Sequence, residues 1–127
     1  MDQAVILSTA RTAIGKAYRG SFNDTDAPTL ASFSIKASIE KVGLDPSEIE
    51  DVILGAAVQQ GSQGYNIGRL AAINSNLPVN VPGMSVDRQC ASGLMAIAIG
   101  AKQIACKEMD IVVGGCLLYT SPSPRDP

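Results

Sequence analysis

The sequence predicts an α/β fold built on a largely parallel sheet. Short apolar runs alternate with longer stretches in which apolar residues recur every three or four positions, an order typical of parallel strands joined by right-handed helical crossovers. The continuous apolar run 51–58 fits a strand that is covered on both faces, as in parallel sheets. With 127 residues, of which 46% are hydrophobic, the chain has the size of one domain and enough apolar side chains for a core.

The first half of the chain contains two expected strands and one expected helix. Residues 5–7 are apolar and indicate a buried strand. A helix is expected over 28–42, because a proline suits its first turn and its apolar residues fall on one face, and Gly43 is a suitable stop. Residues 45–48 carry the pattern of a capping box, and the second strand follows over 51–58.

The second half repeats the alternation of strand and helix. A helix is expected over 66–75, a strand over 83–86, a helix over 90–106 and a strand over 110–114. The helix at 90–106 is apolar almost all round, so we expect it to be buried between layers rather than to lie on the surface.

The residue counts exclude several classes of protein. Ten basic and twelve acidic residues give a formal charge of −2 without any basic cluster, so we expect no nucleic-acid partner. The chain has no histidine, so an imidazole base, a histidine-ligated metal or a Ser-His-Asp triad cannot be completed within it. The longest apolar stretch is interrupted by Gly100 and followed by Lys102, so no membrane span is expected.

Three widely spaced cysteines indicate the redox setting. Cys90, Cys106 and Cys116 form no C-x-x-C pair, and without histidine we expect no metal site. An odd number of cysteines, together with an acidic start at Asp2 that does not fit a signal peptide, indicates reduced thiols and a cytoplasmic location.

Cys90 is the candidate catalytic residue, because it stands at the start of the apolar helix. The unpaired N–H groups and partial positive charge of a helix N-terminus favour a thiolate over a thiol, and the same N–H groups can bind an oxyanion. Small residues at 91–93 leave room for a substrate beside the sulfur. On spacing alone, a buried structural cysteine is an equally good interpretation. Cys106, beside Lys107 at the end of the helix, is interpreted as structural.

The chain resembles the amino-terminal part of the thiolase family, which are acetyl-CoA acyltransferases. The resemblance covers nearly all of residues 4–115 and is carried by five stretches, namely TARTAIG at 9–15, RGSF at 19–22, the segment 60–69, VDRQCASGL at 86–94 and DIVVGG at 110–115. It implies a thiolase-like fold in which this chain supplies most of the first of two similar halves. The block around Cys90 is the most specific part.

The resemblance also implies a reaction. Thiolases transfer acyl groups between CoA thioesters, either by cleaving a 3-ketoacyl-CoA with CoA or by the reverse Claisen condensation. The cysteine that matches Cys90 attacks the keto carbonyl and carries the acyl group as a thioester, while its backbone N–H contributes to an oxyanion hole. CoA and acyl-CoA are the implied substrates, with no bound cofactor, and the complete protein is expected to be a homo-oligomer, a dimer or tetramer.

The chain departs from the family pattern in ways that bear on activity. A histidine from a Gly-His-Pro motif and a second cysteine from a Cys-x-Gly motif complete the family's site, and neither motif is present here. After Gly115 the family continues with an acidic residue and Ser-Met, where this chain has Cys116. Asp87 stands where asparagine is frequent, which we interpret as a tolerated variant. We therefore expect acyl transfer at Cys90 in the intact protein and no activity from this chain alone.

Other interpretations stay open at this point. A ketoacyl-synthase-type condensing enzyme also has a cysteine at the start of a buried helix, and a non-catalytic subunit could keep the fold without the reaction. Asn66 and Arg69 match a region that lies at the subunit contact in thiolase-like proteins and are weaker candidates for an interface. Arg11 and Lys16 are candidates for an anion site, although lone cations are more often solvated surface charges.

The segment 116–127 breaks the alternation of elements. It holds three of the chain's seven prolines and resembles the translation of a transposase-type sequencing adapter, so we expect no regular element in it. The hypothesis is that the thiolase-like domain of residues 1–115 is incomplete and that native sequence ends near Gly115. An independent read of the source DNA is expected to differ from codon 116 onward, and the same bases would refute the hypothesis.

Overall fold

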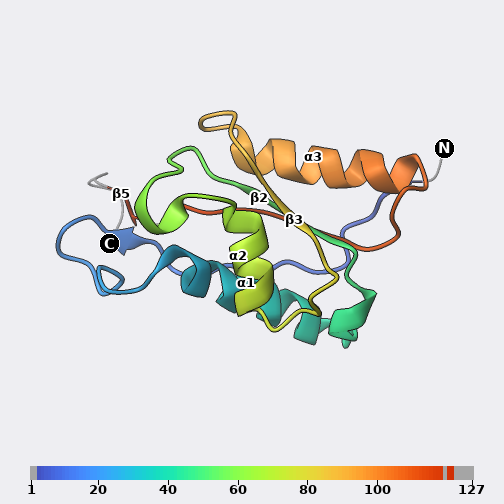
Figure 1. The fold of residues 1–127 in the computed structure, drawn as a ribbon, viewed down its shortest axis with the longest axis horizontal. Coiled ribbons are helices and arrows are strands. Elements are labelled where there is room, and N and C mark those ends of the chain that lie inside the picture. Colours follow the sequence, from blue (N-terminus) through green and yellow to red (C-terminus); the bar gives the residue numbers. More distant parts are fainter. Residues whose placement is uncertain (1–2, 119, 122–127) are drawn as a thin grey trace.

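A three-stranded parallel sheet lies at the centre of the computed structural model, which describes residues 3–118, 120 and 121. Its strands, in spatial order, are β3 (Gly83–Val86), β2 (Asp51–Gly55) and β4 (Val112–Cys116). One face carries two helices and the other carries one (Figure 1), namely α1 (Ala27–Lys41) and α2 (Ile67–Asn74) opposite α3 (Ser92–Ala105). The predicted α/β fold with a parallel sheet is confirmed.

Short elements complete the chain. Single turns of 3₁₀ helix occur at Pro46–Glu48 and Gly61–Gln63. A separate two-stranded parallel sheet pairs β1 (Gly15–Lys16) with β5 (Thr120–Ser121). Among the described residues, no helix has both the length and the apolar character needed to cross a membrane.

Most predicted elements are confirmed with small shifts in their bounds. Strand β3 has the predicted bounds, and α1 and α2 differ from the predicted helices by one residue at each end. The second strand was expected to reach residue 58 but ends at Gly55, where both neighbouring strands also end. Strand β4 begins at Val112 rather than at residue 110.

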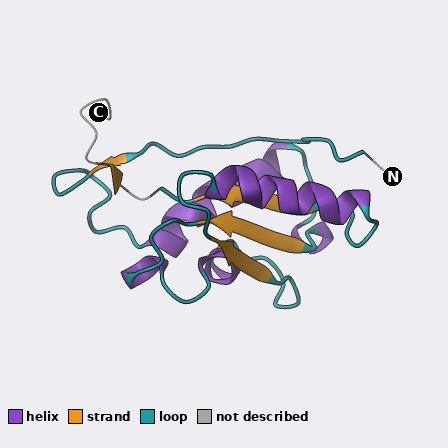
Figure 2. Cartoon of the chain, turned by 90° about the horizontal axis from the view of Figure 1, so that it is seen from above, coloured by secondary structure: helices purple, strands orange, loops and turns teal. Residues whose placement is uncertain are grey.

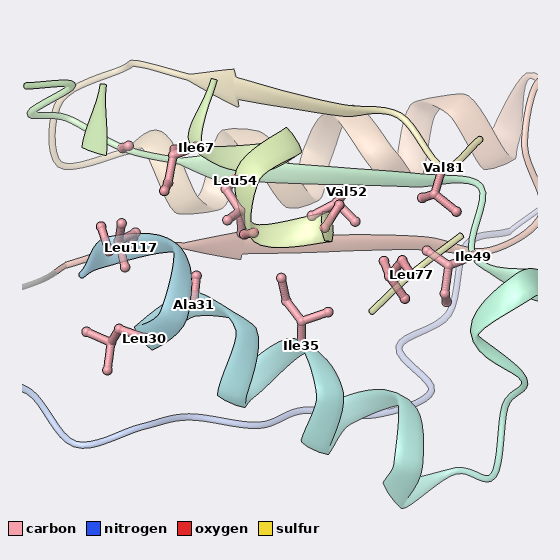
Figure 3. Packing of buried hydrophobic residues seen from close by; sticks show 14 of the residues in the cluster. Leu30, Ala31, Ile35, Ile49, Val52, Leu54, Ile67, Leu77, Val81 and Leu117 are labelled. Atoms are coloured by element: carbon pink, nitrogen blue, oxygen red, sulfur yellow. The ribbon is translucent and has the colours of Figure 1, made fainter. Parts of the chain in front are cut away.

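The main core lies between the sheet and helices α1 and α2. Every residue of β2 is buried, as expected for a strand covered on both faces. Side chains of α1 such as Ile35 face Val52 and Leu54 of β2, with Ile67 of α2 beside them (Figure 3). Full burial of one such aliphatic side chain stabilises a fold by about 1.5–3 kcal/mol, so this cluster holds the two helices on the sheet.

Helix α3 packs on the opposite face through small residues. The helix lies over the strands (Figure 2), and its buried residues are Ser92, Ala96 and Gly100. Some large side chains stay accessible: Leu94 is 74% exposed, and Ile97 is 46% exposed although it lies beside Gly114 of β4. The prediction that this helix is buried between layers therefore holds only for its sheet-facing side in the described chain.

The predicted strand at residues 5–7 is wrong. Val5, Ile6 and Leu7 are 70%, 75% and 58% exposed, and the N-terminal segment runs as a loop until β1 (Figure 2). An apolar run becomes a strand only when a neighbouring strand pairs with its backbone. Within the described residues, the order β3-β2-β4 leaves this segment unpaired.

The expectation that residues after Gly115 form no regular element is also wrong for the part that the structure describes. Cys116 is the last residue of β4, and the N–H of Leu117 donates to the carbonyl of Gly55 over 2.8 Å. Leu117 is only 7% exposed and joins the main core. The reason is that Cys116 pairs with Gly55 through the main chain, which does not depend on its side chain, and that the next residue, Leu117, is apolar and can enter the core. Residues 119 and 122–127 lie outside the described residues.

Close contact between α2 and β3 generates a first prediction. A β-carbon on Gly68 would overlap the backbone of Met84, and one on Gly83 would lie 2.6 Å from the backbone N of Arg69. Gly68→Ala is therefore expected to lower the free energy of unfolding by about 1–3 kcal/mol, measured by urea denaturation. Gly115→Ala is the matched control, because its new methyl would meet one side-chain atom, Leu54 Cδ2 at 3.1 Å, and no backbone atom. Equal unfolding midpoints for the two variants would contradict the prediction.

The confirmed capping box at the first 3₁₀ turn generates a second prediction. The backbone N–H and the hydroxyl of Ser47 both donate to Asp45 Oδ1, over 2.8 Å and 2.6 Å, while Glu48 accepts from the Asp45 N–H. These bonds to Ser47 hold the pKa of Asp45 below its ordinary value. Because the folded pKa is the lower one, the contribution to stability is present above the unfolded pKa and is lost as pH falls through the folded pKa.

Ser47→Ala removes the hydroxyl and leaves the backbone bond. The pKa of Asp45 is expected to rise toward its ordinary value, as measured by carboxyl NMR titration. Ser34→Ala is the control, since that hydroxyl bonds the carbonyl of Ala31 and no carboxylate. An unchanged Asp45 titration in Ser47→Ala would show that the hydroxyl does not stabilise the charged form.

Candidate active site at the carboxyl edge of the sheet

The three strands of the central sheet end at one common edge. The register places Gly55 opposite both Val86 and Cys116, so the carboxyl ends of β2, β3 and β4 coincide. In open α/β sheets, ligands bind in the crevice outside the carboxyl ends of the strands. The turn that joins β3 to α3 begins at this edge (Figure 1), and Cys90 lies in this turn, four residues after the end of β3.

A tight turn presents Cys90 to the surface. Helix α3 was expected to begin at Cys90 but begins two residues later, with Ala91 as its N-cap. Within the turn, the Ala91 N–H donates to the carbonyl of Arg88 over 3.0 Å. Cys90 is exposed and its thiol is free. The exposure argues against the interpretation of Cys90 as a buried structural cysteine.

The residue before the cysteine has an uncommon backbone conformation. Gln89 has φ of 53°, in the left-handed region that residues with a β-carbon rarely adopt. Its N–H donates to Asp87 Oδ1 over 2.9 Å. An asparagine at position 87 would offer the same side-chain oxygen, which gives a physical reason for tolerance of aspartate here.

Ser92, the first residue of α3, was not singled out by sequence. Its side chain is 1% exposed, and its hydroxyl accepts from the N–H of Arg88 over 2.8 Å and donates to the carbonyl of Gln89 over 2.6 Å. A serine near the start of a predicted helix is a recognisable capping signal and could have drawn attention to it. Nothing in the neighbouring sequence indicates that its hydroxyl bonds the main chain of Arg88 and Gln89.

Gly55 allows the start of α3 to rest directly on the end of β2. A β-carbon at Gly55 would lie 2.6 Å from the backbone N of Gly93 and 2.6 Å from the carbonyl O of Ser92. Only glycine permits this approach without a shift of the backbone. The helix N-terminus is thereby fixed against the carboxyl edge of the sheet.

The other two cysteines lie at opposite ends of α3. Cys106 is its C-cap and is exposed, so it is not a buried structural cysteine. Cys116 is also exposed as a residue, but its thiol lies against Gly93 in the first turn of the helix. Burial raises the pKa of the Cys116 thiol above its ordinary value, and a hydrogen bond from the Gly93 N–H offsets this only in part.

Asn66 and Arg69 tie α2 to the segment that enters β3. Asn66 Oδ1 accepts from the Arg69 N–H over 3.1 Å, and its Nδ2 donates to the carbonyl of Gly83 over 2.7 Å. The Arg69 guanidinium donates to the carbonyls of Val79, over 2.9 Å, and Val81. Both side chains therefore have a role within the chain, in holding the strand that leads to Cys90.

The two candidate anion-binding cations do not line the same hollow. Lys16 lines a shallow hollow of about 300 Å³ that also includes Arg19, whereas Arg11 does not line it. Within residues 3–118, 120 and 121, no group of three histidine, cysteine, aspartate or glutamate side chains is placed to hold a metal ion.

The chain is similar to curated proteins over almost its whole length. The chain is 42% identical over 125 residues to an acetyl-CoA acetyltransferase of Cupriavidus necator, covering 98% of this chain and 31% of the relative. It is 40% identical over 115 residues to an acetyl-CoA acetyltransferase of Pseudomonas aeruginosa, covering 91% and 29%. It is 40% identical over 124 residues to the peroxisomal 3-ketoacyl-CoA thiolase 1 of Arabidopsis thaliana, covering 98% and 28%.

The chain thus spans less than a third of the length of these curated relatives. The family model described as the N-terminal domain of thiolase matches residues 4–120, which include every element of the central sheet and the Cys90 turn. The chain therefore belongs to the thiolase family.

Proposed function

We propose that the intact protein transfers acyl groups between CoA thioesters through a covalent acyl intermediate on Cys90. The observation that supports this most directly is the exposed thiol of Cys90, on a turn that opens at the carboxyl edge of the sheet in front of α3. Membership of the thiolase family, with relatives named acetyl-CoA acetyltransferase and 3-ketoacyl-CoA thiolase, supports the choice of substrate class.

The proposed cleavage reaction has two halves, as in ping-pong catalysis. The Cys90 thiolate adds to the keto carbonyl carbon of a 3-ketoacyl-CoA. The bond from that carbon to the α-carbon then breaks, the α-carbon takes up a proton, and acetyl-CoA leaves. The thiolate of a second CoA attacks the thioester on Cys90, which releases the shortened acyl-CoA and restores the cysteine. The condensation direction reverses these steps.

The start of α3 supplies the electrostatics for this chemistry. The dipole of a helix places partial positive charge at its N-terminus, which stabilises a thiolate and a developing oxyanion. The backbone N–H of Cys90 is the proposed contribution of this chain to the oxyanion hole. Of the small residues at 91–93, Ala91 is exposed next to Cys90 and leaves space for the substrate, whereas Ser92 is buried and Gly93 lies against Cys116.

The 127-residue chain by itself is proposed to be inactive. It contains no histidine to accept the thiol proton, and it spans less than a third of its curated relatives. Loss of one general acid–base group lowers a rate by about 10²–10⁴-fold.

We also propose that the intact protein is a cytoplasmic homo-oligomer, on the grounds of its reduced thiols and of the family resemblance. Residues 116–127 are proposed not to be native.

Two alternatives give different results in the same assays. A ketoacyl-synthase-type enzyme would have two downstream histidines in place of the Gly-His-Pro and Cys-x-Gly motifs. A non-catalytic subunit would show slow alkylation of Cys90 with little dependence on pH. A nucleophile would be labelled rapidly at neutral pH.

Substitution of Cys90 in the intact protein tests the proposal. Cys90→Ser is expected to lower the kcat of acetoacetyl-CoA thiolysis by more than about 10³-fold, since removal of a covalent nucleophile abolishes the covalent route. Cys106→Ser is the matched control, because that cysteine is also exposed and free but lies at the far end of α3. Mass spectrometry of wild-type protein exposed to acetyl-CoA is expected to find the acetyl group on the tryptic peptide 89–102.

Two results would contradict the proposal. Thiolysis that survives Cys90→Ser would remove the cysteine from the mechanism. Turnover of acetoacetyl-CoA by the purified 127-residue chain would show that groups from the rest of the protein are not required.

A further inference from the structure

The turn before α3 contains a backbone conformation that has to be held by its neighbours. Gln89 lies in the left-handed region, with φ of 53°, where a β-carbon is crowded. Residues in such conformations persist when surrounding contacts over-determine them, and they concentrate at functional sites. Because Cys90 comes next in the chain, the contacts that hold Gln89 also decide where the thiol stands.

The hydroxyl of Ser92 makes two of these contacts. It accepts from the N–H of Arg88 over 2.8 Å and donates to the carbonyl of Gln89 over 2.6 Å, so it bonds the two residues that precede Cys90. Ser92 is 1% exposed, so water cannot readily take the place of its hydroxyl. Removing the hydroxyl would leave the N–H of Arg88 without this acceptor, which is unfavourable in a part-buried position.

The main chain of Ser92 is itself held in place. The first turn of α3 rests on the end of β2, where a β-carbon at Gly55 would lie 2.6 Å from the carbonyl O of Ser92. A group on a packed helix is a more accurate anchor than a group on a loop. The hydroxyl therefore links the turn to the most rigid part of this edge.

We infer that Ser92 is a positioning residue for Cys90. Its hydroxyl keeps Gln89 in the left-handed conformation and so keeps the thiol at the N-terminal end of α3, where the helix dipole is positive. Ser92 does not need to touch the substrate in order to do this. The inference deepens the proposed function and rests on it only for the statement that Cys90 is the nucleophile.

The test measures how fast iodoacetamide alkylates Cys90 in the 127-residue chain as a function of pH. Trypsin places the three cysteines in separate peptides, 89–102, 103–107 and 108–125, so mass spectrometry follows Cys90 alone. Ser92→Ala is expected to lower the rate at pH 7 about two- to fivefold, the size of effect that a helix N-terminus has on a charged group.

Ser75→Ala is the matched control. It removes another buried serine hydroxyl, which bonds the carbonyl of Ala71 over 2.7 Å in α2 and has no contact with the turn. The stability of the Ser75→Ala variant is expected to fall. The alkylation rate of Cys90 in this variant, and the pH profile of that rate, are expected to stay at wild-type values.

A second substitution separates positioning from general damage. Glycine adopts a positive φ without a steric penalty. Adding Gln89→Gly to Ser92→Ala is therefore expected to return the Cys90 rate to within about a factor of two of wild type. Hydrogen exchange on the wild-type chain, which needs no variant to fold, is expected to show protection of the Arg88 amide by the Ser92 hydroxyl.

The outcomes separate this inference from the proposed function. Equal Cys90 rates in Ser92→Ala and Ser75→Ala, failure of Gln89→Gly to restore the rate, or an unprotected Arg88 amide would each overturn the positioning role. If alkylation of Cys90 depends on Ser92 while thiolysis by the intact protein survives Cys90→Ser, the positioning role stands and the proposed function is wrong.

Discussion

Helices α2 and α3 touch the parallel sheet backbone to backbone, and the rest of the structure depends on this close approach. Gly68 and Gly83 bring α2 onto β3, while Gly55 brings α3 onto the end of β2. The first contact places the strand that leads into the Cys90 turn, and the second places the helix that follows it. The position of the cysteine between them therefore depends on glycines, because a β-carbon at these positions would prevent the close contacts.

The polar contacts at this edge complete what the close packing begins. Asn66 and Arg69 hold the segment that enters β3, and Asp87 and Ser92 hold the turn that leaves it. Each of these bonds has a main-chain partner, so the route of the backbone is fixed at both ends of the strand. The thiol of Cys90 remains exposed at the centre of this arrangement.

Sequence was sufficient where structure is set locally. Strand β3 was predicted with its observed bounds because a proline precedes it and polar residues follow it, and the capping box at Asp45 was predicted because its two partners are three residues apart. A helix next to Cys90 was predicted from the apolar run that follows it, and α3 begins two residues later, while the catalytic role of Cys90 stays a prediction. All of these signals lie within a few residues of the feature that they predict.

Sequence was not sufficient where a distant partner decides the outcome. Residues 5–7 have the composition of a strand but no neighbouring strand in the described chain, whereas Leu117 is buried because its N–H reaches Gly55. The left-handed conformation of Gln89 has no signal in its side chain, since glutamine is not a residue that favours it. The bonds of Ser92 that bracket this residue come from a position three residues later, in the first turn of α3.

The hydroxyl of Ser92 bonds main-chain atoms of residues 88 and 89 and not their side chains. The bonds that shape the turn do not specify which side chains stand at these two positions. Substitutions there can alter charge and bulk next to the sulfur while the sulfur itself stays where it is. The side chains at these two positions can therefore change without loss of the bonds that hold the cysteine in place.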